Sequence, residues 1–158
     1  MTLNINLLIR TDMKKIIIIA AMLLGFAVAA SAQPRAIGLR GGIGVANISY
    51  QHSMGSDFVE ASVGLWGSGF SVEGIYNVML AQPNWTSKGE WGVYAGGGAL
   101  VGVGNVFSLG VGGQVGLEYT FWFPLQLSLD IRPMINVTNL KTNPVSGFYP
   151  TLGIRYKF

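Results

Sequence analysis

The segment Phe107–Phe121, FSLGVGGQVGLEYTF, alternates without exception between two kinds of residue. Its odd-numbered positions are apolar apart from one glycine, and its even-numbered positions hold serine, glycine, glutamine, glutamate and threonine. A period of two residues is that of a β-strand, in which successive side chains point to opposite faces. The segment therefore predicts a long strand with one apolar face and one small or polar face.

The same alternation recurs on both sides of this segment. Leu125–Val137 repeats it, with Pro133 and Met134 as irregular members late in the strand, and Phe148–Phe158 repeats it at the end of the chain. Earlier strands are expected in residues 36–53, 58–66, 70–78 and 91–103, the last with many glycines. No stretch after the N-terminal segment has the roughly 20 consecutive apolar residues of a membrane helix.

The number of strands depends on the segment Ala36–Ser53, in which the apolar phase reverses. Ile37, Leu39 and Ile43 are odd-numbered, whereas Ile48 and Tyr50 are even-numbered. A turn near Gly44–Asn47 would give eight strands, and a bulge within one long strand would explain the reversal equally well. We prefer eight, because single-chain bacterial barrels have an even number of strands.

With eight strands, both termini would be periplasmic. The links near 44–47, 67–69, 104–106 and 138–147 would face outward, and the turns near 53–56, 82–89 and 122–124 would face the periplasm.

Residues 1–32 have the pattern of a secretory signal peptide. Lys14-Lys15 precede the apolar run Ile16–Ala29, and Ala30-Ser31-Ala32 supplies a cleavage site of small residues. Residues before Met13 add nothing that a signal needs, so they are interpreted as extra. The alternative is an uncleaved membrane anchor.

Cleavage would leave residues 33–158 as the mature domain, with seven Lys/Arg and six Asp/Glu. That near-neutral balance gives no basic surface for nucleic acid.

Composition favours a membrane barrel over a soluble one. Of the 158 residues, 50% are hydrophobic and only 11% are charged, while 23 are glycine and none is cysteine. Soluble domains average about 25% charged residues. The strands are long enough to cross a bilayer at a tilt, and glycine on the polar face suits a narrow interior. The predicted fold is an all-β, closed, antiparallel, up-and-down transmembrane barrel. A secreted, soluble, lipocalin-like barrel remains the alternative, with the apolar faces inside.

The end of the chain adds a resemblance. Gly153–Phe158 resembles the terminal strand of outer-membrane barrels, which ends on an aromatic residue and is read by the barrel-assembly machinery. Over its mature length the chain resembles the small, porin-like outer-membrane barrels of Bacteroidota-type Gram-negative bacteria. The matching stretches are Ile37–Arg40, Ser49–His52, Leu117–Tyr119 and Leu125–Asp130. The resemblance implies location in the cell outer membrane, with membrane lipid and the assembly machinery as partners. Aromatic residues near the strand ends fit interfacial girdles.

The polar face predicts charge pairing inside the barrel. Four cations and four anions are expected to point inward, namely Arg40, Arg132, Arg155, Lys157, Glu60, Glu73, Glu118 and Asp130. Unpaired buried charges are costly, so these groups should pair. We interpret them as a polar plug that fixes strand register. The alternative is a narrow, porin-like ion path, which an eight-stranded barrel leaves little room for.

Few residues suggest chemistry. His52, the single histidine, lies next to Ser53 and is expected on the lipid-facing side near an interface. Outer-membrane lipid A deacylases use a serine, a histidine and an acidic residue, but their pattern has one residue between the histidine and a Ser-Asn, which this chain lacks. We interpret His52 as a polar residue at a strand end.

The glycine clusters at 96–98 and 110–113 lack the context of a phosphate loop. We therefore expect a non-enzymatic, monomeric protein with a structural or interaction role in the envelope, and no catalytic, cofactor or metal site. The alternative is a lipid A-modifying enzyme.

Overall fold

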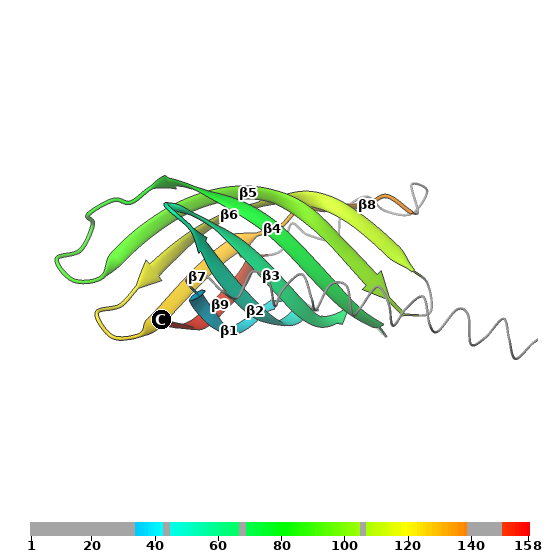
Figure 1. Ribbon diagram of the computed structural model, residues 1–158, viewed down its shortest axis with the longest axis horizontal. Helices are drawn as coiled ribbons and strands as arrows, with labels where there is room; N and C mark the ends of the chain where they lie inside the picture. The colour runs from blue at the N-terminus through cyan, green and yellow to red at the C-terminus, as the bar shows by residue number, and fades with distance from the viewer. Residues whose placement is uncertain (1–33, 43–44, 67–68, 105–106, 139–149) are drawn as a thin grey trace, which may run out of the picture. The chain divides into compact units, whose positions relative to one another are not determined.

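The computed structural model describes residues 34–42, 45–66, 69–104, 107–138 and 150–158, and these form a single antiparallel sheet (Figure 1). Its strands are β1 (Pro34–Gly42), β2 (Val45–Met54), β3 (Asp57–Trp66), β4 (Gly69–Ala81), β5 (Glu90–Val103), β6 (Ser108–Thr120), β7 (Leu125–Ile131), β8 (Met134–Asn136) and β9 (Pro150–Lys157). The predicted signal peptide, residues 1–32, lies outside the described residues. No helix in the described part of the chain is long and apolar enough to cross a membrane.

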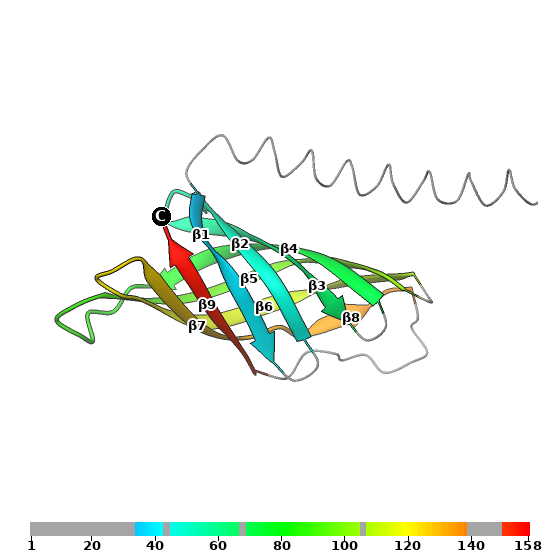
Figure 2. The ribbon, with the colours of Figure 1, turned by 90° about the horizontal axis from the view of Figure 1, so that it is seen from below.

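The sheet closes on itself as an eight-stranded barrel. Each strand from β1 to β6 pairs with the next, and β9 pairs with both β7 and β1. Figure 2 shows β9 and β1 side by side, with the C-terminus beside the start of β1. The short β8 continues the line of β7 along β6, after a break at Arg132-Pro133. The predicted closed, antiparallel barrel of eight strands is thus confirmed, with β8 as one additional short strand.

The strands are strongly staggered around the barrel. From Arg40, the pairing through β2, β3 and β4 reaches β5 at Gly102. The opposite route through β9, β7 and β6 reaches β5 at Gly92. The two routes therefore differ by ten residues along one strand. A stagger of this kind accompanies strands tilted by roughly 35–45° to the barrel axis.

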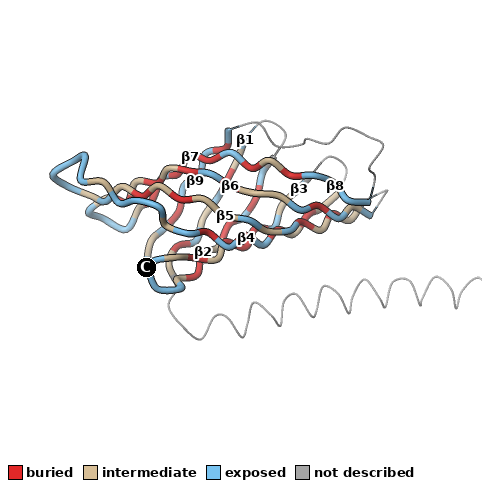
Figure 3. The backbone as a smooth tube through the Cα atoms, turned by 90° about the horizontal axis from the view of Figure 1, so that it is seen from above, coloured by how far each residue is buried: buried red, intermediate tan, exposed pale blue. Residues whose placement is uncertain are grey.

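Burial alternates along the strands in the predicted phases (Figure 3). The exposed positions within the strands are mostly apolar. Leu39, Leu65 and Leu152 are each at least 66% exposed, although all three lie within strands. Most of the fully or nearly buried side chains are polar instead, and include Gln51, Glu60, Gln114, Gln126, Asp130 and Arg155. The lipocalin-like alternative requires the reverse arrangement, with the apolar faces inside.

Two expectations about strand boundaries need correction. The ladder between β1 and β2 continues to the pair Gly42–Val45, so residues 45–47 belong to β2 rather than to the link. The phase reversal itself could not locate the turn, because it shows only that one occurs between Leu39 and Ile48. The segment 125–137 is also two strands, since proline has no N–H to donate to the ladder. Phe148, Tyr149 and nearly all of the 138–147 link lie outside the described residues.

Inward-facing glycines allow close approach between strands. A Cβ added to Gly38 would lie 2.1 Å from the backbone oxygen of Ile154, across the β1–β9 junction. A Cβ added to Gly74, on the outer face, would meet no atom within 4 Å. At Gly38, glycine is therefore needed on the polar face because the backbone of the neighbouring strand passes too close for a side chain.

Gly38→Val is expected to lower the stability of the barrel by about 1–3 kcal/mol, the usual cost of overpacking. Gly74→Val is the matched control and should leave stability nearly unchanged. Urea unfolding in detergent micelles, followed by circular dichroism, measures both variants. Equal stability of the two would contradict the role of Gly38 at the closing seam.

Candidate functional site

The interior of the barrel holds a cluster of paired charges from five different strands. We call Arg40, Arg132, Arg155, Glu60, Glu73 and Asp130 the central charge cluster; all six side chains are at least 91% buried. They come from β1, β3, β4, β7, β9 and the break after β7. Strands on opposite sides of the barrel are therefore connected through these side chains across the lumen.

Arg132 is the centre of the cluster. It donates to Glu73 Oε2 at 2.6 Å and to Glu60, and its Nε lies 3.5 Å from Asp130 Oδ1. It directly precedes Pro133, where the ladder along β6 is interrupted. The break and the most connected cation of the interior thus occupy the same place in the fold.

Arg40 and Arg155 complete the pairing. Arg40 Nη2 lies 2.6 Å from Asp130 Oδ1, and Arg155 Nη2 lies 3.1 Å from Glu60 Oε1. Arg155 also donates to the hydroxyls of Ser49 and Ser128, at 2.9 and 2.7 Å. Three guanidinium groups and three carboxylates balance one another, as buried charges require. The predicted inward positions of these six residues are confirmed.

Arg35 is an interior cation that the sequence did not reveal. It donates to Glu118 and to Gln51 Oε1 (3.0 Å), and its guanidinium carbon lies 4.1 Å from the ring centre of Phe58. Its odd number places it on the apolar phase of β1, so simple alternation predicts that it points outward. A register shift between Pro34 and Ala36 turns it inward instead. No signal in the sequence marks that bulge.

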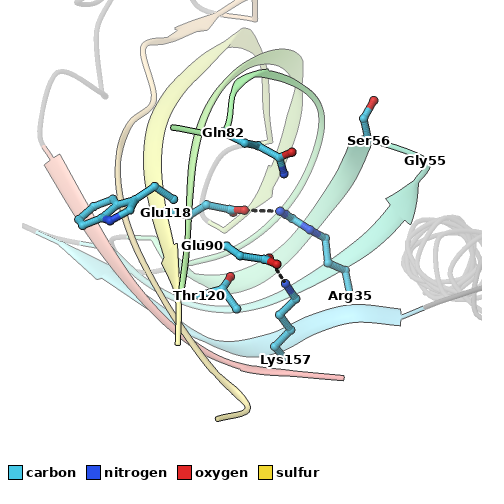
Figure 4. Close-up of a pocket in the computed structure, with 9 residues that line it drawn as sticks. Arg35, Gly55, Ser56, Gln82, Glu90, Glu118, Thr120 and Lys157 are labelled. Atoms are coloured by element: carbon cyan, nitrogen blue, oxygen red, sulfur yellow. Dashed lines mark hydrogen bonds and ion pairs between the residues drawn. The ribbon is translucent and has the colours of Figure 1, made fainter. Parts of the chain in front are cut away.

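Lys157 occupies the barrel mouth rather than the central cluster. Its Nζ lies 3.5 Å from Glu90 Oε2, and the two side chains are 29% and 75% exposed. Figure 4 shows this pair beside the Arg35–Glu118 pair in a pocket of about 290 Å³. The wall is polar, with Ser56, Gln82 and Thr120 among its residues. The mouth lies at the end of the barrel that carries the 55–56, 82–89 and 121–124 connections.

The long 82–89 connection is fastened to the barrel by side chains of two strands. Tyr119 Oη donates to the backbone oxygen of Lys88 at 2.8 Å, and Trp91 Nε1 donates to Thr86 Oγ1 at 3.2 Å. Gly89 has φ +74°, and a Cβ there would lie 2.5 Å from Tyr119 Oη. These contacts hold the 82–89 connection, which is longer than a tight turn, in a defined path.

Aromatic side chains gather at the same end. We call Trp85, Trp91, Tyr119, Phe121, Trp122, Phe123, Tyr156 and Phe158 the aromatic rim; successive ring centres from Trp85 to Phe123 are 4.6–5.9 Å apart. Lys88 Nζ lies 5.6 Å from the centre of the Trp122 ring, which brings the 82–89 connection against the 121–124 turn. The predicted clustering of aromatics near strand ends is present here; the side chain of Trp66 lies outside the described part.

Among the described residues, the hydrogen-bond partner of the His52 ring is a tyrosine hydroxyl. His52 was expected to face lipid, but it is only 8% exposed, although its position belongs to the outward phase of β2. Its ring Nδ1 lies 3.3 Å from Tyr50 Oη. The adjacent Ser53 projects to the opposite face, because side chains alternate along a strand. No carboxylate of the described residues is hydrogen-bonded to the His52 ring. Within the described ranges, no group of three or more His, Cys, Asp or Glu could hold a metal ion.

Comparison of the chain with protein-family models, with curated proteins and with solved structures gives no match. The resemblance to small outer-membrane barrels therefore remains a prediction from the sequence.

Arg132→Gln is expected to lower stability by about 3–5 kcal/mol, because Glu60 and Glu73 would lose a buried partner. Glu90→Gln, which removes a charge from the exposed mouth pair, should cost less than about 1 kcal/mol. Urea midpoints in detergent micelles give both values. A loss for Arg132→Gln as small as that of the control would show that the central charge cluster does not stabilise the barrel.

Tyr119→Phe is expected to loosen the 82–89 connection without unfolding the barrel, since it removes the hydrogen bond to Lys88. Amide hydrogen exchange of residues 82–89 should quicken severalfold, while exchange in β6 and β7 stays slow. Tyr156→Phe is the control, because Tyr156 Oη makes no hydrogen bond within the described residues. Unchanged exchange in 82–89 would contradict the fastening role of Tyr119.

Proposed function

We propose that this chain is a small integral protein of the bacterial outer membrane, with a non-enzymatic structural or interaction role in the envelope. The observation that supports this best is the inverted distribution of polarity in a closed barrel. Leucine, isoleucine and valine side chains cover the outside of the strands, whereas arginine and carboxylate side chains occupy the inside.

The closed sheet gives the proposal a physical basis. In hydrocarbon, backbone N–H and C=O groups find no water, so only helices and closed barrels can span it. This barrel leaves no unpaired edge between β1 and β9 along most of β9. In water, the exposed leucine, isoleucine and valine side chains of the strands would form the kind of apolar surface that monomeric soluble proteins rarely carry.

The paired interior favours a structural role over conduction. A narrow porin-like path would need an open file of water past the central charge cluster, where Glu60 and Asp130 are no more than 1% exposed. An eight-stranded barrel is about wide enough for its own side chains to fill. The contacts of the protein with other molecules would then be made by its outer surface and its two ends.

The first test is gel migration of outer-membrane fractions with and without boiling. A folded transmembrane barrel resists the detergent of the gel until it is boiled, so a membrane-pelleted band should shift on heating. A protein that stays in the soluble fraction and does not shift would contradict the proposal.

Two variants test whether the strands are surrounded by lipid or by water. Leu129, in the middle part of β7, is 48% exposed, and Leu80, near the end of β4, is 61% exposed. In a bilayer, Leu129→Arg should cost about 2–4 kcal/mol and Leu80→Arg about 0–1 kcal/mol, because the cost of arginine depends on depth. Unfolding in lipid vesicles measures both. Small and equal costs would indicate strands that face water.

A further inference from the structure

Two pockets meet at the mouth of the barrel. The polar pocket of Figure 4 lies inside the mouth, and a second pocket of about 480 Å³ lies against the 121–124 turn and the C-terminus. The two share Glu90, Thr120 and Lys157. The second adds an aromatic wall of Phe121, Trp122, Phe123 and Phe158. Charged and aromatic surfaces are thus continuous across the mouth.

The shared charges are available to a ligand. Lys157 and Glu90 are 3.5 Å apart, and the glutamate is 75% exposed, in contrast to the buried pairs of the central charge cluster. An exposed ion pair of this kind contributes little to stability, so each partner can exchange it for a ligand charge at small cost. A ligand with one negative and one positive group would satisfy both residues at once.

The aromatic wall is exposed beside these charges. Trp122, Phe123 and Phe158 are 67%, 44% and 64% exposed. Aromatic side chains with one apolar and one wet side are favoured where hydrocarbon meets water. Apolar chains of a ligand whose charged end lies at Lys157 and Glu90 would find this wall directly adjacent.

We propose that the mouth binds one phospholipid with a zwitterionic phosphoethanolamine headgroup. Lys157 pairs with the phosphate, Glu90 accepts hydrogen bonds from the primary ammonium, and the acyl chains lie along Phe123 and Phe158. The inference rests on the proposed membrane location and goes beyond it by assigning a lipid class to one site.

The headgroup follows from the donors and acceptors at the mouth. A carboxylate binds an ammonium that carries N–H groups by charge-assisted hydrogen bonds, which are stronger than neutral ones. A quaternary ammonium, as in phosphocholine, has no such donor. Its usual partner is the face of an aromatic ring, and the face of Trp122 already has Lys88 Nζ 5.6 Å from its centre.

The experiment uses the full mature barrel, refolded in phosphatidylcholine vesicles, with Trp122 kept and the other three tryptophans replaced by phenylalanine. Lipids with brominated acyl chains quench tryptophan fluorescence on contact. Brominated phosphatidylethanolamine is expected to bind about threefold more tightly at Trp122 than brominated phosphatidylcholine, the size of effect that one exposed charge pair supports.

The double variant Lys157→Gln/Glu90→Gln should reduce this preference to about one. Asp57→Asn is the matched control, since it removes a carboxylate at the same end of the barrel that lines neither pocket, and it should keep the preference. Preference retained in the double variant, or absent in the parent, would overturn the lipid site.

The gel shift on boiling, run on every variant, separates the two proposals. A parent that shifts but shows no headgroup preference contradicts the lipid site alone. A parent that does not shift contradicts both the membrane location and the site that rests on it.

Discussion

Closure of the sheet between β1 and β9 is the constraint on which the rest of the structure depends. Seven backbone pairs, from Ala36–Lys157 to Gly42–Thr151, join the first strand to the last. Once that seam is closed, every strand except the short β8 has two partners, and an inside is separated from an outside. The seam also requires glycine at position 38, because Ile154 leaves no room for a side chain there. The interior and the outer surface then face different demands.

The inside must be both filled and electrically balanced. Four arginines, Arg35 included, face four carboxylates there, and hydroxyl and amide groups share the remaining hydrogen bonds. Replacing such pairs by apolar side chains can leave a protein equally stable, so the charges are not required for stability alone. Their partners lie at particular positions on their strands, however. A shift of two residues would keep the apolar face outside but would move each charge away from its partner. Pairing across the lumen therefore selects one register among those that the apolar outer face would tolerate.

How far the sequence predicts this structure follows from what alternation can and cannot encode. Alternation identifies which face each residue of a regular strand occupies, so it placed Glu60, Asp130 and Arg155 inside correctly. It fails where the ladder is irregular, and Arg35 was missed because a bulge reverses its face. It also assigns a face but no depth. Lys157 has the inward phase, yet it lies at the mouth with Glu90, which was not among the expected inward anions.

The sequence also could not predict which interior charges pair with one another, because the pairing depends on the stagger of ten residues around the barrel. That stagger brings Arg132 on one wall to Glu60 and Glu73 on the other. It also sets which strand ends share the mouth, where the starts of β1 and β5 meet the ends of β6 and β9. The charged groups of the central charge cluster are paired with one another, whereas the mouth has an exposed ion pair and an exposed aromatic wall. Any recognition of another molecule in the described part of the chain is therefore better supported at the mouth than in the lumen.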